Sequence, residues 1–262
     1  MNLLYKVWPL TICSIVFHSC QKVVDINLND SSPQIIIEGV ITNTPGTYQV
    51  QISRTVNFSA ANNYPAISGA LVVIADKTSS ITDTLSENSA GIYITHSIQG
   101  ISGHTYDLFV SSAGQTYSAS STMPFPVPLD SIAMTRRSNF AANGFRTHCY
   151  FQDPASIANY YTFNQLINRK KLNGTNVFGD RLSDGLYISQ RLFSDTADIK
   201  IADTVLVEMN CVDRTVWNYF NTLQNGGVIG LTAPANPTSN ISNNALGYFS
   251  AHSVQSKTAV AQ

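Results

Sequence analysis

The chain has 262 residues, of which 44% are hydrophobic and 12% are charged, and its formal net charge at pH 7 is −1. The apolar share is sufficient for a packed core, so the composition excludes a globally disordered chain. A net charge this close to zero argues against a nucleic-acid-binding protein, because such proteins present a strong basic field.

The N-terminal segment is predicted to be a lipoprotein signal peptide followed by a tether. Lys6 precedes the apolar run 7–17, whose length of about 11 residues fits a signal-peptide core and falls short of the roughly 20 residues that span a membrane. A small residue directly precedes Cys20, which predicts cleavage by a lipoprotein signal peptidase. Residues 1–19 would then be removed, and the acylated Cys20 would anchor the polar tether 20–32 in a membrane. An ordinary secretory signal cleaved nearby is the alternative.

Two cysteines, Cys149 and Cys211, lie in the part of the chain that would be exported. Each falls in a strand-like run, at 146–152 and 204–212. Because exported compartments are oxidising, the pair predicts a disulfide between neighbouring strands, with two buried free thiols as the alternative. Two cysteines without CxxC spacing give no support for a metal site.

Residues 33–123 have the pattern of short strands separated by turns. Apolar and polar residues alternate, or apolar residues run together, in segments rich in Val, Ile, Tyr and Thr. Turn signals recur roughly every 8–14 residues, which predicts an antiparallel, immunoglobulin-like sandwich of about seven strands. The predicted strands cover 34–38, 48–52, 70–75, 91–95, 104–110 and 115–119.

Residues 124–128 contain three prolines and are predicted to be a stiff linker between two domains. Proline favours polyproline II and cannot occupy a central strand. We therefore expect a second, β-rich domain over 129–262, which makes the chain all-β. Its predicted strands cover 131–137, 146–152, 160–169, 186–193, 204–212 and 246–253, and 232–244 is predicted to be a surface loop.

One short helix is predicted in the second domain. Asp213 is a suitable N-cap, and Gly226-Gly227 is a suitable end. Between them, apolar residues follow the helical spacing i, i+3, i+4 and i+7. These residues are Val216, Tyr219, Phe220 and Leu223.

The sequence contains no recognisable catalytic motif. It lacks the G-x-S-x-G, H-E-x-x-H, P-loop and G-x-G-x-x-G patterns. His96, His104, His148 and His252 are scattered, and although His148 adjoins Cys149, neighbouring strand residues point to opposite faces. We therefore predict that the protein is not an enzyme, and that it has no catalytic residue, no cofactor and no metal.

Other clusters of polar or aromatic residues are explained by local structure. Asp180 with Asp184, and Asp195 with Asp198, lie in turn-like segments, and the acidic loops 25–30 and 179–184 lack EF-hand spacing. The basic run Arg169, Lys170 and Lys171 precedes Asn173-Gly174 and predicts a solvated hairpin tip. Core packing is favoured over ligand stacking for two aromatic groups, which are Tyr160, Tyr161 and Phe163, and Trp217, Tyr219 and Phe220.

Several segments resemble the DUF4249 family of Bacteroidota outer-membrane lipoproteins. They are IIIEGVITNTPGTYQVQISRTVNF at 35–58, PAISGALVVIAD at 65–76, the segment 91–132, and NPTSNISNNALGYFSAHSV at 236–254. Cys20 and the short tether precede them. Within 65–119 the spacing of glycines and tyrosines is also similar to a carboxypeptidase-regulatory or transthyretin-like sandwich.

This resemblance implies a function that composition alone does not suggest. Members of the family are often encoded beside TonB-dependent outer-membrane receptors. The resemblance therefore implies a lipid-anchored accessory or binding protein of the outer membrane that partners a TonB-dependent transporter in uptake, with the cell surface favoured over the periplasmic face. The alternative is a structural lipoprotein, such as an adhesin or an envelope-assembly component, that binds proteins through edge strands and has no small-molecule ligand.

Overall fold

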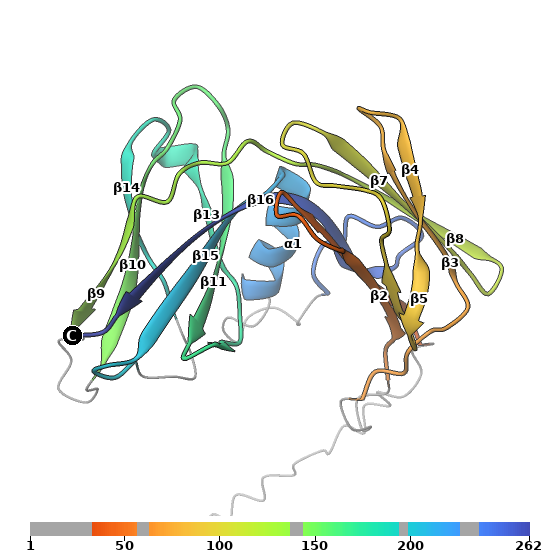
Figure 1. Ribbon diagram of the computed structural model, residues 1–262, viewed down its shortest axis with the longest axis horizontal. Coiled ribbons are helices and arrows are strands. Elements are labelled where there is room, and N and C mark those ends of the chain that lie inside the picture. Colours follow the sequence, from red (N-terminus) through yellow and green to blue (C-terminus); the bar gives the residue numbers. More distant parts are fainter. Residues whose placement is uncertain (1–32, 57–62, 137–143, 194–198, 226–235) are drawn as a thin grey trace, which may run out of the picture.

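The structure is a computed structural model (Figure 1), and it describes residues 33–56, 63–136, 144–193, 199–225 and 236–262. Within these ranges the chain forms sixteen strands, one 3-10 helix and one α-helix, so the predicted all-β class with a short helix is confirmed. The strands build two lobes that meet at the top of an arch. No helix in the described ranges is both long and apolar enough to cross a membrane.

The first lobe is a sandwich built mainly from the N-terminal half of the chain. Its strands are β1 (Ile35–Thr42), β2 (Gln49–Arg54), β3 (Leu71–Asp76), β4 (Ile81–Thr84), β5 (Ser86–Ser89), β6 (Ile92–Ile94), β7 (Thr105–Ser112) and β8 (Gln115–Thr122). The four-stranded sheet β4-β3-β7-β8 faces a layer that contains β1, β2, β6 and β5. Fully buried side chains such as Ile37, Val50, Ile74 and Tyr106 fill the space between them.

The second lobe contains the remaining elements. They are β9 (Ser131–Arg136), β10 (Phe145–Gln152), β11 (Tyr160–Ile167), β12 (Lys170–Lys171), β13 (Asn176–Gly179), η1 (Asp180–Leu182), β14 (Tyr187–Arg191), β15 (Thr204–Cys211), α1 (Arg214–Asn225) and β16 (Leu246–Val260). The three-stranded sheet β14-β10-β9 covers strands β11, β13 and β15. Phe151, Phe163, Val207 and Met209 are buried between these layers.

Strand β16 belongs to both lobes. Its residues 246–252 run parallel to β1, and its residues 253–260 run antiparallel to β15. One nine-stranded sheet therefore passes through the whole arch in the order β12-β11-β15-β16-β1-β2-β6-β5, with β13 beside β11.

The continuous sheet crosses the domain boundary that the sequence predicts at 124–128. Ile241, Ala245, Phe249 and Ala251 lie beyond the proline-rich segment, yet they belong to the core of the first lobe. The alternation at 246–253 predicts a strand but carries no information about its partner. Pairing with β1 joins segments from opposite ends of the sequence, which only the tertiary structure decides.

Both cores lie on the same face of the nine-stranded sheet. Successive strand residues point to opposite faces, and in β16 Phe249 and Ala251 point into the first core. In β15 the corresponding face carries Val207 and Met209, which point into the second core. The two smaller sheets cover this outer face, so the other face of the long sheet lines the inside of the arch.

Helix α1 lies inside the arch, where it packs against β11, β13 and β16. Asp213 caps it as predicted, because its Oδ1 accepts the backbone N–H groups of Thr215 at 2.8 Å and Val216 at 3.0 Å. Its other carboxylate oxygen accepts the hydroxyl of Ser121 from the first lobe at 2.5 Å. The cap therefore also links the two lobes. The predicted helix end at Gly226-Gly227 lies outside the described residues.

Cys149 and Cys211 are buried free thiols rather than a disulfide. Their strands, β10 and β15, belong to different sheets and are not the neighbours that the sequence predicts. The sulfur of Cys211 instead accepts the backbone N–H of Val127 at 3.4 Å. Burial raises the pKa of Cys149 to about 12 and also raises the pKa of Cys211, so both thiols stay protonated.

Candidate functional site

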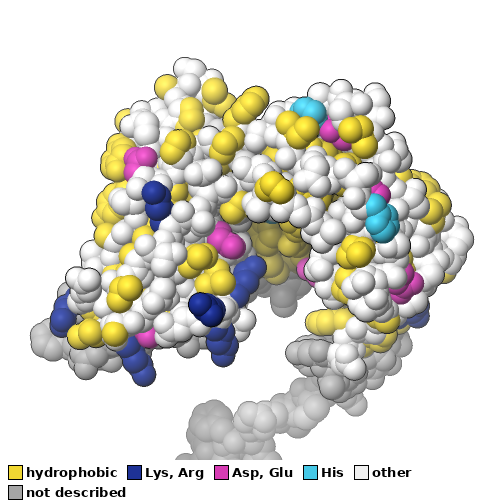
Figure 2. Space-filling model, in the orientation of Figure 1, with side chains coloured by type: hydrophobic (Ala, Val, Ile, Leu, Met, Phe, Trp, Pro, Cys, Tyr) yellow, Lys and Arg dark blue, Asp and Glu magenta, His cyan; other side chains and the backbone are white. Residues whose placement is uncertain are grey.

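The inside of the arch contains a cavity of about 350 Å³, which we call the groove. Figure 2 shows the hollow between the two lobes, which opens at the lower side of the arch. Strands from both lobes line the groove, including β1 and β16 on one side and β11 and β15 on the other. Its polar side chains are Thr42, Thr44, Thr162, Asn164, Lys171, Thr175, Glu208, Asn210, Ser250 and His252.

Polar residues line the groove because the polar side chains of the alternating strands point to the inner face of the sheet. In β15, Val207 and Met209 enter the core, whereas Glu208 and Asn210 face the groove. Buried amides are costly unless they are hydrogen-bonded, and Nδ2 of Asn210 donates to Oγ1 of Thr162 at 3.2 Å. The wall therefore has an ordered set of neutral donors and acceptors, with Lys171 and Glu208 as the charged groups that line it.

Ser250 and His252 form a hydrogen-bonded pair in the groove. The Ser250 hydroxyl lies 2.8 Å from Nδ1 of His252. Burial and the nearby Lys171 ammonium lower the pKa of His252 to about 4, although Asp213 opposes this shift. A histidine with this pKa is neutral at pH 7 and is a weak base, and only 1% of Ser250 is exposed. The pair has the residue types of a nucleophile and its base, but it lacks the accessibility and basicity that they need.

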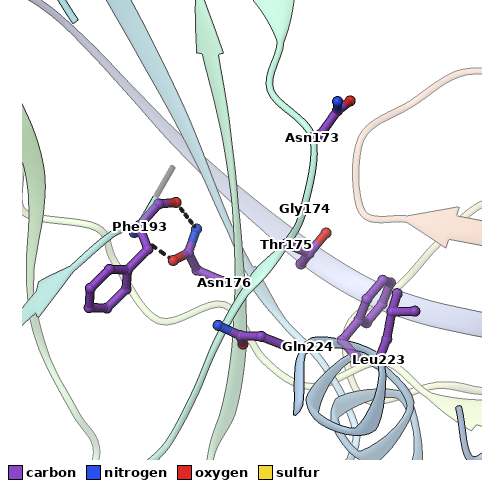
Figure 3. A pocket seen from close by; sticks show the side chains of 8 residues that line it. Asn173, Gly174, Thr175, Asn176, Phe193, Leu223 and Gln224 are labelled. Atoms are coloured by element: carbon purple, nitrogen blue, oxygen red, sulfur yellow. Dashed lines mark hydrogen bonds between the residues drawn. The ribbon is translucent and has the colours of Figure 1, made fainter. Parts of the chain in front are cut away.

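A second, smaller cavity of about 250 Å³ continues from the groove toward the end of α1. The two cavities share Thr175 and Phe220. Asn176 fixes one wall, because its amide donates to the carbonyl of Phe193 at 3.0 Å and accepts the N–H of Phe193 at 2.7 Å (Figure 3). Together the two cavities form an elongated surface of mixed polar and apolar side chains along the inside of the second lobe.

Aromatic side chains attach α1 to the sheet and form the apolar part of the groove. The ring centroid of Tyr248 lies 5.0 Å from that of Tyr219 and 4.9 Å from that of Phe220. Trp217 lies 5.4 Å from Tyr160 by the same measure. Tyr161 and Phe163 are fully buried in the second core. Packing therefore accounts for both predicted aromatic groups, while Phe220 and Tyr248 also line the groove.

Three carboxylates meet at the upper end of the second lobe. Ligand oxygens of Asp153, Asp180 and Asp184 lie within 4.8 Å of one another, which is a spacing that a hard cation such as Ca²⁺ could use. The buried Asp153 accepts the hydroxyl of Tyr161 at 2.5 Å and the N–H of Gly185 at 3.1 Å. These bonds hold two loops together. Of the pairs considered from sequence, Asp180 and Asp184 are thus brought together.

Comparison with known proteins places the chain in a family. Residues 21–258 match a family described as Domain of unknown function (DUF4249). The chain belongs to the DUF4249 family. Among curated proteins, none matches the sequence. The matched range of this DUF4249 protein includes both lobes and all the residues that line the groove.

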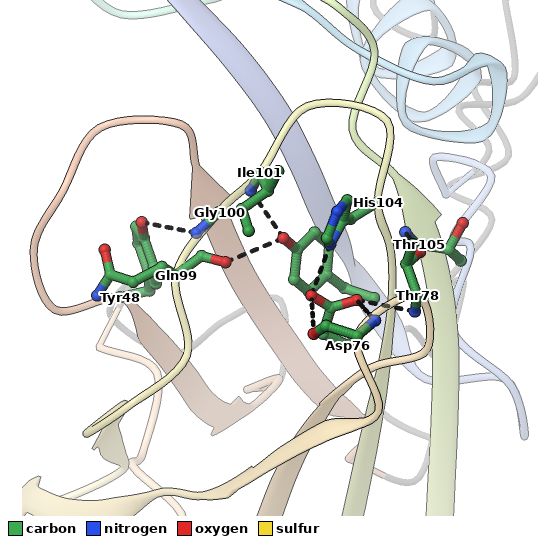
Figure 4. Close-up of polar contacts among 10 residues, drawn as sticks. Tyr48, Asp76, Thr78, Gln99, Gly100, Ile101, His104 and Thr105 are labelled. Carbon is green, nitrogen blue, oxygen red and sulfur yellow. Dashed lines mark hydrogen bonds and ion pairs between the residues drawn. The ribbon is translucent and has the colours of Figure 1, made fainter.

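Two histidines of the DUF4249 chain, His104 and His148, lie outside the groove. Nδ1 of His104 lies 2.7 Å from the buried carboxylate of Asp76 in the network that joins three loops at one end of the first lobe (Figure 4). Burial raises the pKa of Asp76, but hydrogen bonds from His104, Ser79 and Thr78 outweigh this effect and leave the pKa lowered. His148 is half-exposed and the adjacent Cys149 is buried, so the two point to opposite faces as predicted.

The remaining predicted sites of the DUF4249 chain lie outside the described residues. They are the lipidation site Cys20, the acidic segment 25–30, and Asp195 with Asp198. Sequence reasoning did not identify the groove. The available signal was the alternation of apolar residues with polar ones in parts of β15 and β16, such as Glu208 and Asn210, and Ser250 and His252. That signal marks a face of a strand but not the opposite wall that makes the face a groove.

Proposed function

We propose that this DUF4249 protein is a non-enzymatic binding lipoprotein of the outer membrane that holds a ligand in the groove and assists a TonB-dependent transporter in uptake. The observation that supports ligand binding is the groove. Ligand sites are typically concave and often lie between structural units, and the groove lies between strands of the two lobes. The membrane anchor at Cys20 and the transporter partner rest on the signal-like N-terminus and on family membership.

The chemistry of the groove favours binding over catalysis. Ser250 is too buried for a substrate to reach its hydroxyl, and the lowered pKa of His252 makes it a poor general base. The neutral Thr and Asn side chains that dominate the wall suit a polar ligand held by hydrogen bonds. Phe220 and Tyr248 add apolar contact area beside them.

A pull-down from native membranes in mild detergent, followed by mass spectrometry, tests the partner. The expected result is a TonB-dependent receptor in stoichiometric amount. A chain with Cys20→Ser should leave the membrane fraction, because the acyl chains supply about 0.8 kcal/mol for each buried methylene. Recovery of the protein alone, or with filament or assembly proteins, would contradict the proposal and favour a structural lipoprotein.

Native mass spectrometry of the purified protein tests the groove. Asn164→Trp places a large ring among the groove residues, and Ser189→Trp places the same ring on the exposed strand β14 as a matched control. The ligand mass carried by the wild type should remain with Ser189→Trp and disappear with Asn164→Trp. Equal retention by both variants would remove the groove as the binding site.

A further inference from the structure

Basic side chains gather at the lower end of the second lobe, where β9 and β11 end and β10 and β15 begin (Figure 1). Figure 2 shows the dark blue side chains over this end of the lobe. Each lies within two residues of that end of a strand or in the turns that join the strands there. We call this group the basic end, and it consists of Arg136, Arg146, Arg169, Lys170, Lys171 and Lys200.

Among the described residues, no ion pair neutralises a cation of the basic end. The salt bridges among the described residues join Lys77 to Asp107 and His104 to Asp76, so they involve none of these cations. Asp203 is the acidic side chain in the described part of this end, and it bonds the backbone N–H of Lys200 and the side chain of Asn168. Arg136 lies over the ring of Phe145, 5.5 Å from its centroid. Cations at such density repel one another unless an anionic partner approaches.

The two ends of the second lobe differ in their charged side chains. The opposite, upper end holds the three carboxylates of Asp153, Asp180 and Asp184. Nearby on β10, burial lowers the pKa of His148, and the charges of Arg191 and Arg146 lower it further. Exposed cations therefore gather on the lower side of the lobe, whereas two of the three upper carboxylates are buried and lie close to the exposed Arg181.

The lower side of the arch is also where the chain enters from its N-terminal segment. Strand β1 begins at the lower end of the first lobe, and the turn that follows it lies at the top of the arch. Cys20 precedes the first described residue by 13 positions, and an extended chain spans at most about 3.5 Å for each residue. An anchor at Cys20 would thus keep Pro33, which directly precedes β1 in the first lobe, within about 45 Å of the membrane.

We propose that the basic end docks on anionic lipid headgroups of the membrane that carries the anchor. The orientation rests on the proposed acylation of Cys20, whereas the charge distribution is a property of the folded chain. Each Lys or Arg close to an anionic surface contributes about 1 kcal/mol of attraction. Docking would stand the second lobe on the membrane beside the tethered first lobe and hold the groove open toward the lipid surface.

Vesicle co-sedimentation tests this docking. The protein is the chain from residue 20 onward with Cys20→Ser, so that no acyl group contributes to binding. It should bind phosphatidylcholine vesicles that contain phosphatidylglycerol, release at about 1 M salt where the Debye length is about 3 Å, and ignore vesicles of phosphatidylcholine alone. The triple variant Arg169→Glu, Lys170→Glu and Lys200→Glu should lower the partition coefficient about 100-fold or more.

A matched triple variant separates a local patch from overall charge. Lys77→Glu, Arg181→Glu and Arg214→Glu change the net charge equally, and their positions are exposed and outside the basic end. This control should keep at least half of the wild-type binding. Equal loss in both triples, no binding by the wild type, or equal binding to neutral vesicles would overturn the proposal.

The vesicle assay and the pull-down test different claims, so either can fail without the other. The basic-end substitutions do not alter the groove, because Lys171, which lines the groove, is not substituted. A failed vesicle assay with a receptor in the pull-down would therefore reject only the docking surface. Vesicle binding without a receptor or membrane retention would reject the proposed function and leave the anionic-lipid surface in place.

Discussion

The backbone N–H of Val254 donates a 2.8 Å hydrogen bond to Oδ1 of Asn43. Asn43 lies in the turn after β1, and Val254 lies in the part of β16 that pairs with β15. The bond therefore joins a first-lobe turn to the second-lobe half of the shared strand. It satisfies a backbone donor at the point where β16 passes from one partner strand to the other.

Asn43→Ala should lower the free energy of unfolding by about 1–2 kcal/mol, because the N–H of Val254 loses its acceptor. Thermal or denaturant unfolding measures this change. Asn88→Ala, in the fully exposed strand β5, is the control and should change stability by less than about 0.5 kcal/mol. An equal effect of the two substitutions would mean that the bond does not stabilise the junction.

Gly247 is expected to be irreplaceable at the start of β16. Its φ is +92°, and a Cβ built there would lie 2.0 Å from the carbonyl oxygen of Ile37. Gly247→Ala should therefore cost more than about 4 kcal/mol or prevent folding, because the neighbouring strand β1 would have to move. Soluble yield and denaturation midpoint provide the measurement.

Gly114→Ala is the matched control for this substitution. Its φ is +76°, but a Cβ there meets no atom within 4 Å. Only the cost of the left-handed conformation remains, which is about 1 kcal/mol. Similar losses for both alanine variants would show that the close approach of Gly247 to β1 is unimportant.

Asp83 is expected to make stability depend on pH. Its carboxylate accepts the N–H groups of His96, Ser97 and Ile98 at 2.7–3.0 Å. Burial raises its pKa, but these three bonds outweigh that effect and leave the pKa lowered. The stabilisation is therefore complete above the unfolded-state pKa of about 3.9, and it is lost as the pH falls through the lower folded-state pKa.

Asp83→Asn should lower the free energy of unfolding by about 2 kcal/mol at pH 7 and flatten its decline below about pH 4. Denaturant unfolding across this pH range measures both effects. The control is Asp107→Asn, whose half-exposed ion pair with Lys77 at 3.4 Å should contribute less than about 1 kcal/mol. An unchanged pH profile in Asp83→Asn would assign the dependence to other carboxylates.

Cys149 and Cys211 are expected to resist thiol reagents in the folded protein. Burial raises the pKa of Cys149 to about 12, so almost no thiolate is present at pH 8. In the chain from residue 20 onward with Cys20→Ser, both thiols should react only after unfolding in guanidinium. The absence of reactive thiols in the unfolded, non-reduced chain would instead establish the disulfide that the cysteine count favours.

The sequence by itself determined most of the local structure. Strand alternation located β1, β7, β10, β11 and β15, and the spacing of Val216, Tyr219 and Phe220 located α1 together with its cap Asp213. It missed β4 and β5, whose sequences ITDT and SENS are polar and almost wholly exposed. These short segments are strands because β3 and β6 supply their hydrogen-bond partners, and such support is not encoded in local hydrophobicity.

Only the tertiary structure decided how the two halves of the chain form one arch. The period of a strand specifies which side chains share a face, but not which strand lies beside it. The parallel pairing of β16 with β1 and its antiparallel pairing with β15 create the continuous sheet. Because that sheet bends with both cores on its outer face, polar residues such as Ser250 and Asn210, which are far apart in the sequence, meet in one groove.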